Sequence, residues 1–147
     1  MYKYLLLIHV LGATIWTGGH LVLALTVLPK ALKTRNVEAI RQFESGYERI
    51  GMPALFVQVI TGIWLAYRVL PDPAAWFSFG SHTSTHILLK LVALTLTLIL
   101  AMHARLRIIP RLDERRLTLL GYHIVSVTIL AVIFVILGVS FRTGGLL

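Results

Sequence analysis

Histidine is the residue type that gives this sequence most of its chemical potential. Six histidines occur in the chain; one of them, His82, falls in a polar segment, and the others lie in long apolar runs: His9, His20, His86, His103 and His123. An ionisable side chain at membrane depth is costly, so each of these five is a candidate functional residue. Neutral imidazole binds haem iron and first-row metals. We therefore expect a haem or metal site built from histidines on different helices.

Several other chemistries are excluded by the residues that the chain lacks. The absence of cysteine rules out disulfides, iron–sulfur clusters and thiolate metal sites. The long apolar runs contain no Asp or Glu, which argues against a carboxylate-based proton carrier. No glycine-rich nucleotide motif, P-loop or nucleophile elbow is present. The remaining candidates for chemistry are the histidines and a few cations.

The composition places the chain among polytopic membrane proteins. Hydrophobic residues make up 57% of the chain and charged residues 14%, and the mean hydropathy is +0.83. These values exclude a soluble globular domain. The net charge of +8 is typical of a membrane protein with basic loops, so it does not indicate nucleic-acid binding.

Four apolar runs predict an all-α, integral membrane four-helix bundle that forms a single domain. The expected spans are about residues 4–28, 52–69, 83–104 and 117–141. The first run continues into Pro29 without a signal-peptide cleavage site, so we interpret it as an uncleaved span that ends at this proline. Between the first two spans, VEAIRQFESGYERI has the apolar spacing of a short amphipathic helix on the membrane surface.

The distribution of positive charge predicts the orientation of the bundle. Ten of the fourteen Lys and Arg residues lie in two segments, 30–51 and 105–116, and the loop 70–82 has none. The positive-inside rule then places both basic segments in the cytoplasm and both termini outside. We expect this arrangement in a cytoplasmic membrane of the bacterial type.

Helix rise converts sequence position into depth and sorts the polar residues into two clusters. The outer cluster contains His9, His86 and Lys90, with Arg68 and Arg142 at the membrane edge. The inner cluster consists of the other three histidines of the spans: His20, His103 and His123. Facing imidazoles at matched depth suit bis-histidine haem ligation, and edge cations suit haem propionates.

The main hypothesis is a membrane redox protein that holds haem b between its helices. One haem would lie between His9 and His86, and a second between His20 and either His103 or His123. Two irons would then be about 16 Å apart, which would carry electrons across the membrane. A quinone or a periplasmic redox protein would exchange electrons with it. A membrane oxidoreductase is therefore one interpretation, but the sequence leaves enzymatic activity, and assembly into a homo-oligomer, open.

Copper or other metal transport through the same histidines is the alternative. Met52 and Met102 lie near the inner cluster, although three methionines and no cysteine provide few of the soft ligands that Cu(I) prefers. A third interpretation is that the histidines only pack or hydrogen-bond, in which case the protein is colourless. His82 and His86 have the i, i+4 spacing of a surface metal site, but no third ligand is defined. Lys90 could equally extend its amine outward to the membrane surface.

Three segments resemble the copper-resistance D family. They are IHVLGATIWTGG, FESGYERIGMPALFVQVITGIWLAYRV and HILLKLVALTLTLILAMHARLRIIPRL. The chain is also similar to the related HemJ-type protoporphyrinogen oxidases, through His9, the segment from Pro53 to Trp64, Lys90 and His103. That resemblance implies haem b with His9 as a ligand, and it implies Lys90 beside the porphyrin as a catalytic residue. The segment TVLPKAL differs from that branch and favours the broader copper-resistance grouping.

Overall fold

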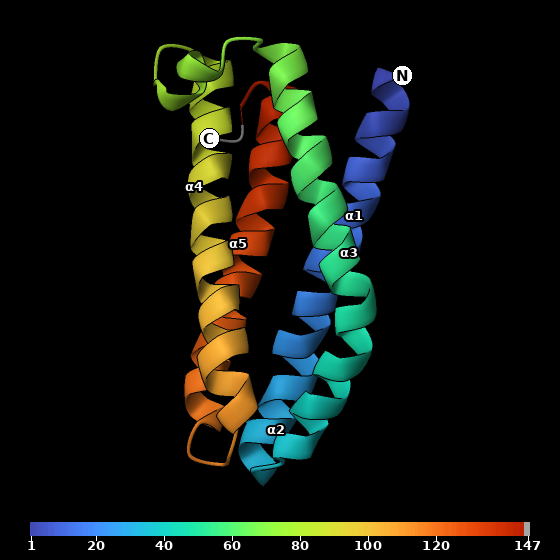
Figure 1. Ribbon diagram of the computed structural model, residues 1–147, viewed down its shortest axis with the longest axis vertical. Coiled ribbons are helices and arrows are strands. Elements are labelled where there is room, and N and C mark those ends of the chain that lie inside the picture. The colour runs from blue at the N-terminus through green and yellow to red at the C-terminus, as the bar shows by residue number, and fades with distance from the viewer. Residues whose placement is uncertain (146–147) are drawn as a thin grey trace.

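The computed structural model describes residues 1–145 and forms a bundle of long helices (Figure 1). Among these residues there is no strand, and four helical segments are long and apolar enough to cross a membrane. They are Tyr2–Thr34, Val37–Val69, His82–Arg111 and Leu117–Thr143. The prediction of an all-α bundle with four membrane helices is therefore confirmed.

The first helical segment continues as a helix beyond Pro29, where we expect the membrane span to end. It consists of α1 (Tyr2–Val22), the π-helical turn η1 (Leu23–Val27) and α2 (Leu28–Thr34). A proline inside an α-helix removes one hydrogen bond and clashes with the carbonyl four residues earlier. Here the wider turn η1 precedes Pro29, which lies in the first turn of α2 and needs no such bond. The helix ends at Arg35, which has a left-handed backbone (φ 54°).

The expected surface helix and the second span form one continuous element, α3 (Val37–Val69), and their separation was a wrong prediction. The Asn36 side chain begins this helix by accepting a hydrogen bond from the Ala39 amide at 3.1 Å. Pro53 lies inside α3 without ending it. A helix of 33 residues is about 50 Å long, whereas the hydrocarbon core of a bilayer is about 30 Å thick. Part of α3 must therefore extend beyond the membrane.

A compact loop joins α3 to α4 (His82–His103). It contains the 3₁₀ turn η2 (Pro73–Phe77), and the indole of Trp76 donates a hydrogen bond to the Leu70 carbonyl at 2.8 Å. Ser81 and Ser84 form a reciprocal cap at the start of α4. After α4 the chain passes through a second π-helical turn, η3 (Ala104–Ile108), and the short turn η4 (Ile109–Arg111), which contains Pro110. The last helix, α5 (Leu117–Thr143), ends at Gly144.

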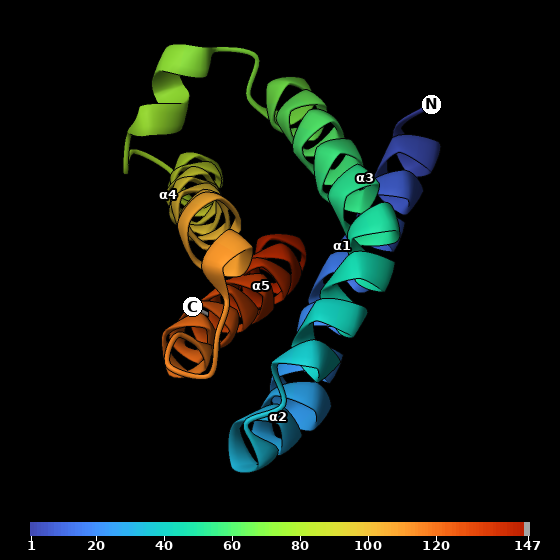
Figure 2. The same cartoon turned by 60° about the horizontal axis from the view of Figure 1, so that its bottom comes forward.

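The helices pack as two pairs, α1 with α3 and α4 with α5, and α1 also contacts α5 (Figures 1 and 2). The largest buried apolar cluster lies at the end of the bundle that contains η1, α2 and η3. We call it the closed-end core, and its members include Leu23, Ile40, Ile108, Leu117 and Leu120. A smaller cluster around Trp16 and Val127 lies farther along the bundle. The packing is therefore densest at one end.

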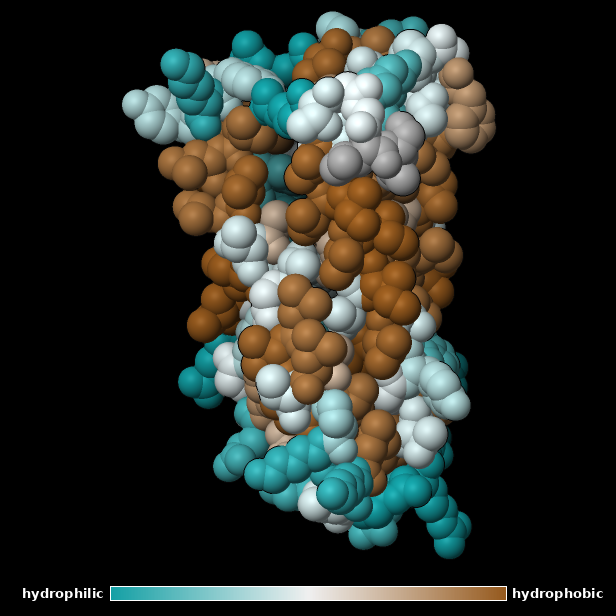
Figure 3. Space-filling model, turned by 180° about the vertical axis from the view of Figure 1, so that it is seen from behind, coloured by the Kyte–Doolittle hydropathy of each residue, from teal (hydrophilic) through white to brown (hydrophobic). Residues whose placement is uncertain are grey.

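The outer surface has the pattern of a protein embedded in lipid. Many large apolar side chains are exposed, such as Leu25, Phe56 and Ile60. In Figure 3 the hydrophobic side chains cover the middle of the molecule, and hydrophilic side chains gather at both ends. The start of α1, the loop with η2 and the end of α5 share one end of the bundle, and the basic segments lie at the other. Which end faces the cytoplasm stays a prediction from the charge distribution.

Candidate functional site

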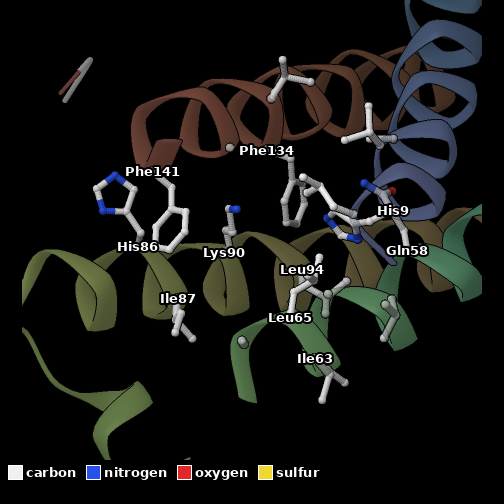
Figure 4. A pocket seen from close by; sticks show the side chains of 18 of the residues that line it. His9, Gln58, Ile63, Leu65, His86, Ile87, Lys90, Leu94, Phe134 and Phe141 are labelled. Atoms are coloured by element: carbon white, nitrogen blue, oxygen red, sulfur yellow. The ribbon is translucent and has the colours of Figure 1, made fainter. Parts of the chain in front are cut away.

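The four long helices enclose a cavity on the side of the bundle away from the closed-end core. Its volume is about 730 Å³, and its lining comes from α1, α3, α4 and α5 (Figure 4). Most of the lining is apolar. The charged, imidazole and amide side chains in it are His9, Gln58, His86, Lys90 and Arg142, and among the described lining residues there is no Asp or Glu. All three members predicted for the outer cluster therefore line one cavity.

His9 is held in one orientation and one protonation pattern. Its Nδ1 lies 2.9 Å from Thr61 Oγ1, and that hydroxyl donates its own proton to the Val57 carbonyl at 2.6 Å. Thr61 Oγ1 therefore accepts from His9 Nδ1–H, and the lone pair of the neutral imidazole lies on Nε2. In Figure 4 the imidazole is drawn beside the ring of Phe134, with Gln58 nearby. This is the arrangement that a metal-binding histidine requires, with one nitrogen oriented by a partner and the other available.

Glycines allow α1 and α3 to approach closely enough for this contact. A Cβ atom on Gly62 would lie 3.1 Å from His9 Cε1, and one on Gly12 would lie 3.1 Å from the Ala54 carbonyl oxygen. Any larger residue at position 62 would push the imidazole away from Thr61. The sequence pair Thr61-Gly62 therefore provides both the hydrogen-bond partner and the space for His9.

His86 is buried in the same cavity wall but has both nitrogens engaged. Nδ1 lies 2.8 Å from the His82 carbonyl oxygen, and Nε2 lies 3.0 Å from Ser140 Oγ. The carbonyl can only accept, so Nδ1 carries the proton and Nε2 accepts from the serine hydroxyl. The side chain joins α4 to α5. It could bind iron or copper only after losing its contact with Ser140.

The predicted cations are divided between the cavity and the outer surface. Lys90 is half-buried, and its Nζ lies 5.6 Å from the centre of the Phe141 ring. Arg142 donates a hydrogen bond to the hydroxyl of Tyr2 at 2.5 Å. Arg68 is exposed at the end of α3, beside a separate shallow groove lined by Tyr2 and Trp64. Only Lys90 and Arg142 therefore contribute positive charge to the described cavity lining.

The three histidines predicted for the inner cluster are placed in two different environments. His103 Nδ1 lies 2.9 Å from His123 Nε2, with the ring centres 5.0 Å apart. His20 donates from Nδ1 to the Trp16 carbonyl at 3.0 Å, and its ring contacts those of Trp16 and Tyr47. Within residues 1–145 no group of three or more His, Cys, Asp or Glu side chains could hold a metal. The inner end therefore offers a histidine pair and a separate histidine among aromatic rings.

Three residues of the site were not identified from the sequence: Thr61, Ser140 and Tyr47. The first two are the hydrogen-bond partners of His9 and His86. Tyr47 packs between Gly19 and Gly51 and donates to the Trp16 carbonyl at 3.0 Å. A hydroxyl inside an apolar helix was the available signal for the first two, but such a hydroxyl usually bonds its own helix.

Comparison with known proteins identifies the family. Residues 41–141 match the family described as copper resistance protein D. No curated protein and no solved structure matches the chain. The match covers more than half of the sequence and includes α4 and most of α3 and α5. The chain therefore belongs to the copper resistance protein D family, and it is a multi-pass membrane protein of a family linked to copper resistance.

Proposed function

We propose that this chain binds copper inside its helix bundle and carries it across a bacterial cytoplasmic membrane, with the basic segments on the cytoplasmic side. The observation that carries the proposal is the state of His9. Its Nδ1–H is fixed by Thr61, which leaves the Nε2 lone pair for an ion in the cavity. Imidazole is a good copper ligand, and copper forms the most stable complexes among the divalent first-row metals. Membership of the copper resistance protein D family supports the choice of metal.

The closed-end core blocks the path of the ion through the bundle. The cavity extends from Arg142 to Trp16, Thr17 and Thr97, and the buried cluster around Leu23 and Leu120 lies beyond it. An ion bound at His9 can therefore leave toward the opposite end only when this core rearranges. Such a barrier at one end of the cavity is what a carrier needs to avoid an open pore.

Copper uptake into proteoliposomes tests this proposal. The purified chain is reconstituted with a copper-sensitive dye inside the vesicles, and His9→Ala is compared with His82→Ala, which changes an exposed histidine of the loop end. We expect His82→Ala to match the unmodified protein and His9→Ala to lose most of the uptake. Uptake no faster than in protein-free vesicles, or equal uptake by His9→Ala, would overturn the proposal.

Haem binding is the second candidate, because the cavity is much larger than a metal ion needs. A volume of about 730 Å³ and a mostly apolar lining are typical of sites for organic ligands. A haem b in this cavity would be held by His9, and Lys90 and Arg142 would be available to its propionates. A pairing of His9 with His86 fits less well, since Ser140 occupies His86 Nε2. Bound haem would supply one-electron chemistry, and the chain would orient it and exclude water.

An absorption spectrum of the purified protein distinguishes the two candidates. A Soret band, with a sharp α-band after reduction by dithionite, would favour haem, and His9→Ala should then remove it. A colourless protein that contains copper would favour the first candidate. Iron and copper are measured on the same sample, so that a protein sample containing neither metal is recognised.

A further inference from the structure

The histidine pair at the end of α4 brings two imidazole nitrogens to within hydrogen-bond distance of one another. His103 is the last residue of α4 and is exposed, and His123 is half-buried in the second turn of α5. The Nδ1 atom of the first lies 2.9 Å from the Nε2 atom of the second, and the two rings are inclined by only 25°. No residue of the cavity lining belongs to this pair.

The hydrogen bonds fix where the protons are. His123 Nδ1 lies 3.0 Å from the Leu119 carbonyl oxygen, which can only accept, so this nitrogen carries the proton. His123 Nε2 must then accept a hydrogen bond from His103 Nδ1–H. The remaining lone pair of the neutral pair lies on the exposed Nε2 of His103. One proton therefore occupies the space between two ring nitrogens.

A metal ion can replace that proton without a net change in protonation. If the proton of His103 moves from Nδ1 to the exposed Nε2, two lone pairs face each other across the gap, and a cation between them is stabilised. With the two lone pairs facing each other, metal–imidazole bonds of about 2.0–2.1 Å are nearly collinear and need about 4 Å between the nitrogens. The present separation is 2.9 Å. A displacement of about 1 Å by the exposed His103 ring is enough.

We propose that His103 and His123 form a two-histidine copper site at the basic end of the bundle, separate from His9. This proposal extends the proposed function, because it places a copper ligand on the outer surface beside the closed-end core, where Ala104 and Ile124 follow the two histidines in the chain. With two protein ligands, the remaining coordination positions belong to water or to the molecule that delivers or receives the ion. Such a site holds copper briefly, which suits transfer better than storage.

The other histidine pair shows why the arrangement of nitrogens matters. His82 and His86 have ring centres only 4.1 Å apart. The nitrogens of His86 are nevertheless engaged by the His82 carbonyl and Ser140, so no lone pair of His86 points at the His82 ring. His82→Ala is therefore the matched control, as it removes an exposed histidine of the same helix at its opposite end.

The test is a titration of the detergent-purified full chain with Cu⁺ in competition with a coloured Cu⁺ chelator. In a His9→Ala background, we expect one copper per chain to remain. Adding His103→Ala or His123→Ala should weaken that binding more than roughly 10–100-fold. Losses of about 10–100-fold are typical when the residue removed only hydrogen-bonds a metal ligand and does not touch the metal. Adding His82→Ala should leave it unchanged. Equal binding in all of these proteins would overturn the proposal.

A second measurement does not depend on the folding of the double variants. Copper(II) bound to the His9→Ala protein is examined by electron paramagnetic resonance, and coupling to two imidazole nitrogens is expected. Coupling to none or one would refute the pair. If the unmodified protein fails to take up copper into vesicles but the His9→Ala protein shows the two-nitrogen signal, transport is rejected and the site is kept. If the unmodified protein takes up copper but the His9→Ala protein lacks the signal, the two-histidine site alone is rejected.

Discussion

The hydrogen bond between Thr61 and His9 is the contact on which the chemistry of the cavity depends. It holds the imidazole in the tautomer whose Nε2 is free to bind a ligand. Thr61 itself would touch neither copper nor haem through this bond, so it is a positioning residue. Its effect on ligand affinity can be measured separately from the loss of His9.

Replacing Thr61 with valine keeps the shape of the side chain and removes the hydroxyl. We expect Thr61→Val to weaken copper or haem binding by about 10–100-fold, because the imidazole loses its fixed tautomer and orientation. The control is Thr95→Val, in which an exposed hydroxyl bonded to its own helix at the Leu91 carbonyl is removed. Equal affinities for the two variants, measured by competition titration, would contradict this role.

Sequence reasoning identified the functional residue types but not their partners. A histidine inside an apolar run is visible as an anomaly, so all five candidates could be named from the sequence. Whether two histidines meet depends on how each helix is rotated about its own axis. That rotation brings His103 to His123 and turns His20 toward Tyr47, although depth alone had grouped the three together.

At the scale of the helices, the close contact between α1 and α3 depends on small residues. The Tyr47 ring lies where a Cβ atom on Gly19 would be, and a Cβ atom on Gly51 would lie 2.7 Å from the same ring. The ring also stacks on Phe43 and contacts the edge of His20. Tyr47 therefore fills the seam between the two helices next to Trp16.

Adding a methyl group in this seam should separate the helices. We expect Gly19→Ala to lower the stability of the folded protein by about 1–3 kcal/mol, because overpacking forces side chains and backbone apart. Gly18→Ala is the matched control, since a Cβ atom on the adjacent Gly18 would meet nothing within 4 Å. Thermal unfolding in detergent compares the two, and identical midpoints would show that Tyr47 moves aside without cost.

A proline follows each of the two π-helical turns. Both π-helical turns end two residues before a proline, Val27 before Pro29 and Ile108 before Pro110. The extra residue in each turn changes which carbonyl faces the proline ring, so the chain stays helical where a clash was expected. The lengths of the apolar runs were enough to predict four membrane helices. Whether a helix can continue past a proline depends on the backbone conformation just before it, which composition does not reveal.

For the whole molecule, the distribution of charge makes the orientation a testable prediction. The chain contains no cysteine, so a single introduced thiol reports one position without background. Phe79 is 74% exposed in the loop between α3 and α4, and Glu114 is exposed in the basic segment before α5. The positive-inside rule places these two positions on opposite sides of the membrane.

In intact cells, a membrane-impermeant maleimide should label Phe79→Cys and spare Glu114→Cys. Both variants should be labelled after the membrane is permeabilised, which controls for the reactivity of each thiol. Labelling of Glu114→Cys alone in intact cells would reverse the orientation.

The uneven packing of the bundle has a mechanical consequence. The helices are joined firmly by the closed-end core, and the cavity lies toward their other ends. Each helix pair can thus rotate as a rigid body about that core. A rotation of about 5° there displaces helices by about 3 Å at a distance of about 30 Å, equal to 20 residues of helix. The width of the cavity is then set by a small angle at a distant point.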